Sequence, residues 1–512
     1  MMPSSAQPTS RAKPIERSRR KFLLIPILCL AAGSCTLGTD FKSPQQPEGD
    51  SYDREAAPPL SAPGTKEVEQ HLTLGKEISG QWWQLFQSGD LDKVVAQAIE
   101  GNKSLVAAEA TLAQAQEIVN AAAGALSPQV DLSAGVSRNK SNGASAGFKT
   151  PPLVYNFFTI KPTLTYDLDI FGGTKRQIEQ QRALAEVQEY QVAATWLTLT
   201  GDAVAQAILI ASTRAQIATI EGIVEDDRQN LQLVTTAYNN GAVAQPDVDI
   251  ARSQLASDRA LLPPLRQQLS VARHALAVTL GQRPVDWTPP DFDLRTLAVP
   301  QDLPLSLPSE LARQRPDILA AEAQLHAANA AVGVATAAQY PNITLTASLG
   351  ADALNPGHFF TDAANVWSLG AGLTAPIFNG GTLAAQRRAA ENAYRAVLAN
   401  YQRTVVQALG QVADSLQALG HDAELLSVQQ EAIDAAQSSV DLTRIAYTAG
   451  TVTVLQLLEA QRFLEQAKLG YVRAQAQRLA DTAQLFVTLG GGWWDWREKS
   501  RKTAALEAIP PK

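Results

Sequence analysis

The sequence predicts a mostly helical protein with four β-strands, organised as an internal tandem repeat. Two proline-free stretches, about residues 174–238 and 382–447, have continuous helical patterns. A pair of alternating, strand-like segments precedes each stretch. Landmarks also recur in order along the chain: AAEA at 107–110 and 320–323, Phe171 and Phe378, and Gly241 and Gly450. Each copy is expected to run helix, strand, strand, long helix, glycine turn and shorter helices.

The N-terminus predicts a lipoprotein signal peptide over residues 1–34. Basic residues precede the apolar run Phe22–Ala32, which is too short to span a bilayer as a helix. The small residues of AGSC then lead to Cys35 as in a bacterial lipobox, although Ala32 stands where leucine is usual. We expect lipid on Cys35, and the alternative is ordinary cleavage that leaves a free thiol. Thr36 follows, where an aspartate would suggest inner-membrane retention, so sorting to the outer membrane is expected.

The next segment, residues 35–80, is expected to be a lipidated N-terminal tether, and residues 42 to about 80 are rich in proline, serine and glycine. This composition favours an extended tether over a packed element. The folded body is expected to begin near Trp82, with a first repeat over 81–300 and a second over 301–493. Residues 494–512 are expected to form a mobile C-terminal tail.

The strand predictions rest on alternation. In IKPTLTYDLDIF the apolar positions share one face: Ile160, Leu164, Tyr166, Leu168 and Ile170. NITLTASL at 342–349 alternates in the same way, and VDLSAGV and VWSLGAGLTAPIF supply two more strands. The pattern suits a transmembrane barrel and equally a soluble sandwich with one wet face. Four strands leave open edges, so a membrane barrel would have to be shared between chains, with eight strands from two or twelve from three.

The two long helices exceed the needs of a globular domain. About 65 residues at 1.5 Å each make a rod of roughly 95–100 Å. Their sequence is rich in alanine and glutamine and poor in large apolar side chains. This favours closely packed helical walls that face water on one side, and the alternative is a solid coiled-coil stalk.

Composition argues against several functions. A net charge of -7 disfavours a nucleic-acid partner. The scattered histidines lack metal-ligand spacing, so no metal site is expected: His71, His274, His326, His358 and His421. We found no phosphate-binding loop, nucleophile elbow or defensible catalytic carboxylate pair. No enzyme activity and no cofactor beyond the covalent lipid on Cys35 are expected.

Several motifs together resemble one known family, the outer-membrane channels of tripartite efflux pumps in the NodT-like lipoprotein branch of the TolC/OprM class. The matching stretches, which run in the family's order from Cys35 to Trp493, are CTLGTDFKSP, DLDIFGGTKR, RPDILAAEAQL, PIFNGGTLAAQRRAAENAY, YTAGTVTVLQLLEAQR and LGGGW.

The resemblance implies a homotrimer with a single twelve-stranded β-barrel in outer-membrane lipid, four strands coming from each chain. The helices would continue as a long periplasmic tunnel, with a mixed belt of short segments around it. The implied function is a passive exit duct for small molecules that an inner-membrane RND-type pump expels through a periplasmic adaptor (membrane fusion) protein. The alternative is a structural lipoprotein rod or adhesin without a channel.

The same resemblance assigns roles at the two glycine stops. The turns would be periplasmic tips that dock the adaptor, formed by Asn240, Gly241, Ala242, Ala449, Gly450 and Thr451. Leu455 and Glu459, at i and i+4 on one helix face, would line the periplasmic constriction as an apolar and an acidic ring. Tyr447 and Asp247 match residues that latch neighbouring helices. The family's basic latch residue is replaced here by Val452, which puts a charge-based latch in doubt.

Overall fold

The computed structural model describes residues 36–45, 49, 51–53, 59–60, 70–76, 78–142, 147 and 151–498. The predicted signal peptide and Cys35 lie outside the described residues. The chain forms two compact units. The first contains the described residues up to Asp40 with Ala121–Glu179 and Ala330–Ala390, and the second contains the remainder.

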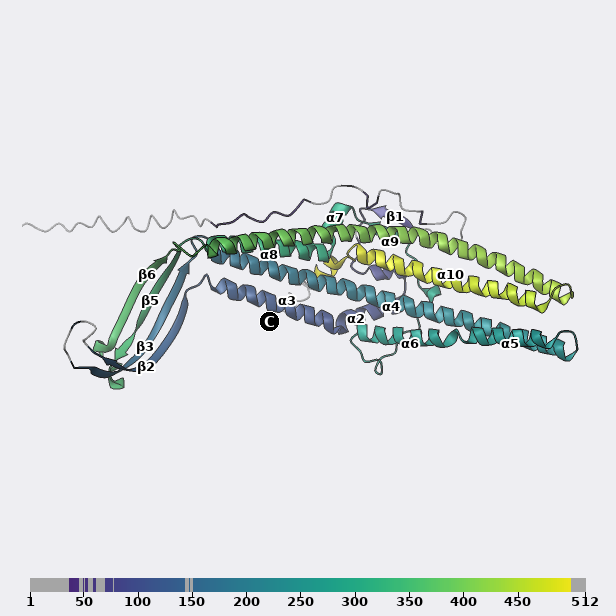
Figure 1. Ribbon diagram of the computed structural model, residues 1–512, viewed down its shortest axis with the longest axis horizontal. Helices are drawn as coiled ribbons and strands as arrows, with labels where there is room; N and C mark the ends of the chain where they lie inside the picture. The colour runs from purple at the N-terminus through teal and green to yellow at the C-terminus, as the bar shows by residue number, and fades with distance from the viewer. Residues whose placement is uncertain are drawn as a thin grey trace, which may run out of the picture. The chain divides into compact units, whose positions relative to one another are not determined.

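The first unit contains a four-stranded antiparallel sheet in the order β2-β3-β5-β6. Its strands are β2 (Gln129–Ser141), β3 (Leu153–Leu168), β5 (Asn342–Ala353) and β6 (Asn365–Thr374), shown on Figure 1. All four predicted strands are present. Strand β3 begins at Leu153, seven residues before the predicted start, because the register with β2 continues to Ser141.

The register brings the apolar positions of all four strands onto one face. Val130 lies opposite Leu164, Leu164 opposite Ala347, and Ala347 opposite Leu369. The other face carries polar side chains: Asp131, Ser133, Lys161, Thr163, Thr165, Asp167, Thr344, Thr346, Ser348 and Ser368. Several of these bond to one another, as in Ser348–Ser368 at 2.7 Å. The expected alternation is therefore present across the whole sheet.

The long helices match the sequence to within one residue at each end. Helices α4 (Gly173–Asn239) and α9 (Thr382–Thr448) each have 67 residues, which gives roughly 100 Å of helix. A window of 18 residues in α4 is apolar enough for a membrane span, but 56% of that window is buried inside protein. Its hydropathy is explained by packing against other helices.

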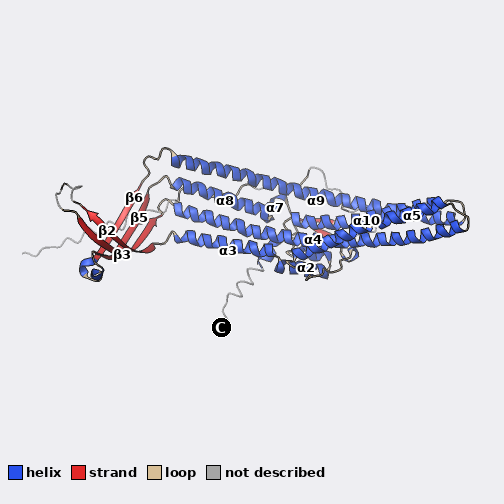
Figure 2. Ribbon diagram, turned by 60° about the horizontal axis from the view of Figure 1, so that its bottom comes forward, coloured by secondary structure: helices blue, strands red, loops and turns tan. Residues whose placement is uncertain are grey.

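Shorter helices complete a recurring order. Helices α3 (Lys103–Gly124) and α8 (Pro316–Ala337) precede the two strand pairs. Helices α5 (Gln245–Arg259) and α6 (Leu262–Thr279) follow α4, and α10 (Val454–Thr488) follows α9. In the second unit α9 and α10 lie side by side, as do α4 and α5 (Figures 1 and 2).

Aromatic side chains fill the core of the second unit. Trp82 and Phe86 of the 3-10 helix η1 (Trp82–Phe86) are fully buried. The Trp82 ring stacks on Phe486 at 5.3 Å between centroids. Helix α2 (Gly89–Gly101) packs on the same core through Leu91, Val94 and Val95.

Part of the predicted tether is packed rather than extended. Strand β1 (His71–Leu74) pairs in parallel with β4 (Asp302–Leu305). The buried guanidinium of Arg478 donates to the Leu60 carbonyl at 2.9 Å and to Gln70 Oε1 at 3.0 Å. Leu60 and Ile78 also lie in the apolar core, so the segment that was expected to form an extended tether is packed in part.

The described start of the predicted tail is also packed. Trp496 stacks on Trp196 at 5.4 Å between centroids, and Asp495 Oδ2 accepts a hydrogen bond from the Gly80 amide at 3.1 Å. Residues 494–498 are therefore part of the folded body. Residues 499–512 lie outside the described residues.

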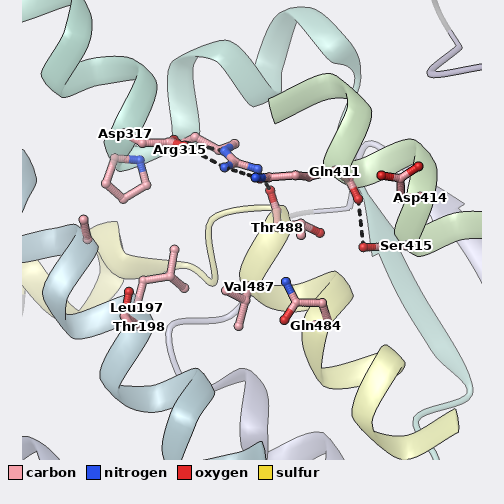
Figure 3. Close-up of a pocket in the computed structure, with 12 residues that line it drawn as sticks. Leu197, Thr198, Arg315, Asp317, Gln411, Asp414, Ser415, Gln484, Val487 and Thr488 are labelled. Atoms are coloured by element: carbon pink, nitrogen blue, oxygen red, sulfur yellow. Dashed lines mark hydrogen bonds and ion pairs between the residues drawn. The ribbon is translucent and has the colours of Figure 1, made fainter. Parts of the chain in front are cut away.

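A buried arginine joins three helices of the second unit. Arg315, between α7 (Pro308–Gln314) and α8, donates to the Thr488 carbonyl and to Gln411 Oε1, both at 2.8 Å. Asp317 receives two further bonds from it. These side chains line a cavity of about 400 Å³ (Figure 3). The RPD motif thus fixes the carboxyl end of α10, where backbone carbonyls lack helical partners.

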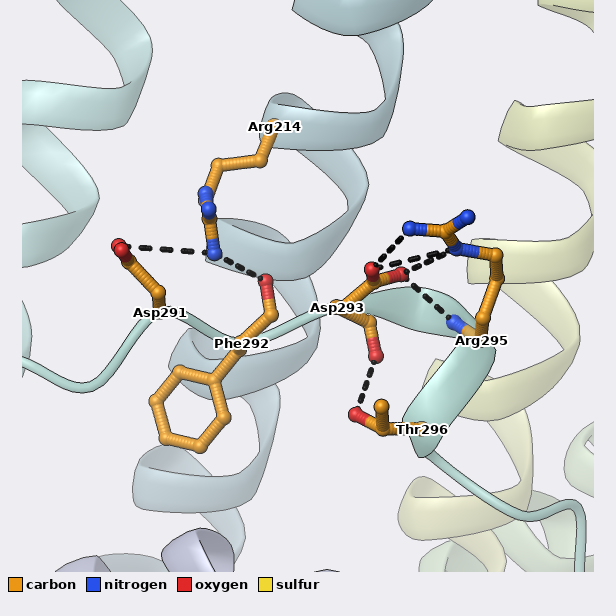
Figure 4. Close-up of polar contacts among 6 residues, drawn as sticks. All are labelled: Arg214, Asp291, Phe292, Asp293, Arg295 and Thr296. Atoms are coloured by element: carbon orange, nitrogen blue, oxygen red, sulfur yellow. Dashed lines mark hydrogen bonds and ion pairs between the residues drawn. The ribbon is translucent and has the colours of Figure 1, made fainter.

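The segment between α6 and β4 is held by charged groups (Figure 4). Arg214 of α4 donates to the Phe292 carbonyl at 2.9 Å and lies 3.5 Å from Asp291. Next to it, side-chain and backbone hydrogen bonds from Arg295 lower the pKa of Asp293 to about 2. Leu294 of η3 (Leu294–Thr296) is thereby held in the core.

Candidate tip and constriction site

Helix α4 ends in a glycine turn that is closed by two backbone hydrogen bonds. Gly241 has φ +75°, and its amide donates to the Tyr238 carbonyl at 2.8 Å. The Ala242 amide donates to the Ala237 carbonyl at 2.9 Å. This pair of bonds is a Schellman motif, which requires a left-handed residue at the glycine position.

Helix α9 ends in the same way. Gly450 has φ +72°, and its amide donates to the Tyr447 carbonyl at 2.9 Å. The Thr451 amide donates to the Ala446 carbonyl, also at 2.9 Å. Nothing lies within 4 Å of a Cβ built on either glycine, so backbone conformation rather than space selects glycine at both positions.

The next helix begins four residues after each glycine. Before α5, the Ala244 amide donates to Asp247 Oδ2 at 3.0 Å. Before α10, the Thr453 amide donates to Gln456 Oε1 at 2.9 Å. In both turns a side chain at the third helical position therefore satisfies the amide at the cap. The sequence analysis did not predict these capping side chains.

A small apolar cluster lies behind the turns. Its buried members come from α4, α5 and α10: Val234, Val248, Ala251, Val454 and Leu458. Tyr447 of α9 packs against this cluster. The cluster brings Tyr447 near the start of α5, whereas the Asp247 carboxylate is engaged by the Ala244 amide of its own turn. The latch role of Tyr447 and Asp247 stays a prediction.

The two predicted constriction residues project away from the apolar core of α10. Leu457 and Leu458 are buried, while Leu455 remains 49% exposed. Glu459 is also exposed, and its Oε1 lies 3.7 Å from Arg462 Nη2. The arginine was missed in the sequence, although its i+3 spacing from Glu459 was a usable signal. Any acidic ring formed by Glu459 therefore has a basic neighbour one turn away.

An acidic cluster with one buried and two half-buried members joins three helices behind the tips. It consists of Asp227 on α4, Asp258 on α5 and Glu465 on α10, and Asp227 is only 4% exposed. Burial and the neighbouring Asp258 raise the pKa of Asp227 to about 7. Burial and the three nearby aspartates Asp227, Asp258 and Asp226 raise the pKa of Glu465 to about 8, while Lys468 opposes this. The cluster therefore contains carboxyl groups that are protonated near neutral pH.

Metal chemistry has no support at these positions. Within the described part of the chain, no group of three or more His, Cys, Asp or Glu side chains is arranged to hold a metal ion.

Comparison with known proteins identifies the family. The family profile described as "Outer membrane efflux protein" matches residues 94–282 and 307–491, most of the chain. The chain belongs to the outer membrane efflux protein family. Both glycine turns and all four strands lie inside the matched residues.

Full-length relatives agree with this assignment. The pyoverdine export outer membrane protein OpmQ of Pseudomonas aeruginosa is 32% identical over 436 residues, covering 84% of this chain and 91% of that protein. The probable outer membrane lipoprotein SilC of Salmonella typhimurium is 26% identical, with 92% and 99% covered. The solved outer-membrane channel OprN is 28% identical and superimposes with a TM-score of 0.81, covering 90% of this chain and 100% of OprN.

The protein is an outer-membrane efflux channel, and it extends into the periplasm. These comparisons support the duct and not the alternative of a rod or adhesin without a pore. OpmQ is named as an export protein and OprN as a channel. The comparisons thus confirm the family predicted from the motifs. The mostly helical body of this efflux channel matches the predicted fold class.

Proposed function

We propose that three copies of this channel form one twelve-stranded barrel, which continues into a helical periplasmic tunnel. This proposal rests on the four-stranded sheet, which has one continuous apolar face and one polar face. In the first unit, β2 and β6 each pair on one side only. Open edges are not tolerated in hydrocarbon, and joining β6 of one copy to β2 of the next removes them. The tandem repeat then gives each copy two similar wall segments.

The channel has no energy source of its own in this proposal. An inner-membrane RND-type pump drives cargo, and a periplasmic adaptor connects the pump to the channel. OpmQ is named for pyoverdine export, which supports a small-molecule cargo. The docking tips are Asn240, Gly241, Ala242, Ala449, Gly450 and Thr451, whose exposed turns are supported by rigid caps.

The constriction is formed in this proposal by Leu455 and Glu459 from three copies. Their exposure on α10 leaves them free to face a lumen. Tyr447 and Asp247 help to hold the tip helices together at rest. Docking of the adaptor moves these helices apart, and the apolar and acidic rings widen.

Lipid attached to Cys35 adds a second attachment to the outer membrane, and no other cofactor is required. The name of SilC as a lipoprotein supports this anchor. The mature channel then begins at Cys35 and contains the repeats at 81–300 and 301–493.

Single-channel recording in planar bilayers tests the duct. We expect purified trimers to form pores of small resting conductance that are cation-selective. The double change Leu455→Ala and Glu459→Gln should raise conductance several-fold and reduce cation selectivity, because it removes both rings. Val428→Ala, at an exposed position on α9, is the control. A trimer without any pore, in the wild type and in the double variant, would refute the channel proposal.

A further inference from the structure

A buried arginine at the start of α4 binds the chain that follows the predicted lipid site. Arg176 is 3% exposed although it carries a full charge. Its Nε donates to the Leu37 carbonyl at 3.0 Å, and its Nη2 donates to the Gly38 carbonyl at 3.3 Å. Nη2 also donates to Asp40 Oδ1 at 2.8 Å. Three contacts thus reach a segment more than 130 positions away in the sequence.

The same segment is held from its other side by the corner between β3 and α4. The Leu37 amide donates to the Phe171 carbonyl at 3.1 Å. A Cβ placed on Gly172 would lie 2.8 Å from Thr36 Cα, so this glycine admits the segment at close range. Thr36 is the residue directly after Cys35 in the chain.

A glycine inside α8 provides room for both partners. A Cβ on Gly333 would lie 2.9 Å from Arg176 Cγ and Cδ, and one on Gly38 would lie 2.9 Å from Gly333 Cα. A glycine in a helix interior costs roughly 0.5–1 kcal/mol relative to alanine. The close contacts of Gly333 with Arg176 and Gly38 leave no room for a side chain, which explains a glycine at this position despite its cost in stability.

The second long helix lacks this arginine. Aligning Thr174 with Thr382 places Ala384 at the position of Arg176, and aligning the helix starts places Ala385 there. Both long helices form with 67 residues, so the arginine is not needed to start such a helix. The chain has a single N-terminal segment, and of the two long helices only α4 has the arginine that binds it.

From these contacts we propose that Arg176 clamps residues 36–40 to the corner between β3 and α4. The clamp holds the lipid anchor near the end of the barrel strands, and the anchor is therefore not attached through a flexible linker. This inference rests on the proposed lipid on Cys35. Irregular backbone costs about 1–2 kcal/mol per residue to order. A charged guanidinium fork, which offers several donors in fixed geometry, is suited to hold it.

Hydrogen–deuterium exchange of the intact trimer in detergent tests the clamp. In Arg176→Ala and in Asp40→Ala, we expect a peptide covering residues 36–45 to exchange about tenfold faster than in the wild type. Arg176→Lys should give an intermediate rate, because an ammonium cannot reproduce the fork. Glu179→Gln is the matched control: Glu179 accepts from Arg176 Nη1 at 2.6 Å but belongs to α4 itself.

Cleavage after Lys42 by a lysine-specific protease gives a second measurement, with the same order of rates expected. Unchanged exchange in both alanine variants would overturn the clamp. An equal acceleration in Glu179→Gln would also overturn it, since Arg176 would then merely support α4. Palmitate labelling of the wild type and of Cys35→Ala tests the lipid separately. Labelling that is absent from the wild type overturns the anchoring role, and pore recordings show independently whether the duct stands.

Discussion

The hairpins α4–α5 and α9–α10 end in the same turn but have different interiors. In each, a left-handed glycine closes a Schellman motif and a side chain six residues later caps the next helix. Behind the first turn lie the buried carboxyl group of Asp227 and the half-buried carboxyl group of Asp258. Behind the second, Val440 of α9 packs on Ala460 and Leu464 of α10.

The comparison shows that the turn and the packed interior of the hairpin place different requirements on the sequence. The turn is local backbone chemistry, so both copies retain it. The interior is free to diverge as long as the helices pack. Titratable carboxyl groups therefore lie close behind the first turn, whereas the residues close behind the second turn are apolar. The second hairpin has its buried carboxyl group farther from its turn, at Asp422 of α9, where burial and Asp481 of α10 raise the pKa to about 7.

The largest effect expected from this contrast is a loss of stability at alkaline pH. The pKa of Asp227 rises from 3.8 to about 7 and that of Glu465 from 4.5 to about 8. The folded state therefore holds protons that the unfolded chain releases, and stability falls as pH rises from roughly 4 to 8. Asp227→Asn should remove part of this loss, on the order of 2 kcal/mol, when thermal unfolding at pH 6 and pH 8.5 is compared.

A matched control for this pH effect is Asp434→Asn. Asp434 lies exposed on α9 and accepts a hydrogen bond from Gln430 at 2.9 Å. Its removal should leave the pH profile unchanged. A wild-type unfolding temperature that is flat from pH 5 to pH 8.5 would contradict the acidic cluster.

The two hairpins also show which structural features could be predicted from the sequence and which could not. The ends of α4 and α9 follow from local signals, a long helical pattern ending at Tyr-x-x-Gly, and they match to within one residue. The acidic cluster was missed because 227, 258 and 465 share no sequence pattern, and only tertiary packing brings them together. Strands β1 and β4 were missed because HLTL and DLPL are too short to show a period.

Site prediction was limited in the same way. The motif DLDIFGGTKR contains Arg176, yet its partners lie at 37–40, and no spacing rule connects the two. The tips were identifiable because glycine is selected there by its own backbone conformation. The capping role of Asp247 was obscured because Ala244 stands where the known pattern usually has serine or threonine. The capping role of Gln456 was missed although Thr453 at its cap fits that pattern.

An effect of intermediate size should be the same in both turns. Replacing Gly241 or Gly450 with valine forces a β-branched residue into the left-handed region, which costs about 1–2 kcal/mol at each position. Adaptor binding, measured by titration against the trimer, should weaken in both variants if both tips dock.

Gly222→Ala distinguishes this turn effect from a general loss of glycine. Gly222 lies in α4, has no atom near a built Cβ, and does not have positive φ. Alanine there should stabilise the helix by roughly 0.5–1 kcal/mol and leave adaptor binding unchanged. Weaker binding from only one valine variant would show that the two similar turns do not share the docking role.

The smallest effect concerns the charge of the capping side chain, which differs between the two turns. Asp247 is negative near the positive end of the α5 dipole, whereas Gln456 is neutral at the same position of α10. Asp247→Asn should lower stability, and Gln456→Glu should raise it, each by about 0.3–1 kcal/mol at neutral pH and low salt. Thermal unfolding of single and double variants measures both, and the swap should nearly cancel because the sites are local and separate. A destabilising Gln456→Glu would indicate that Glu459, one turn later, already sets an acidic field at the start of α10 and that another charge there is unfavourable.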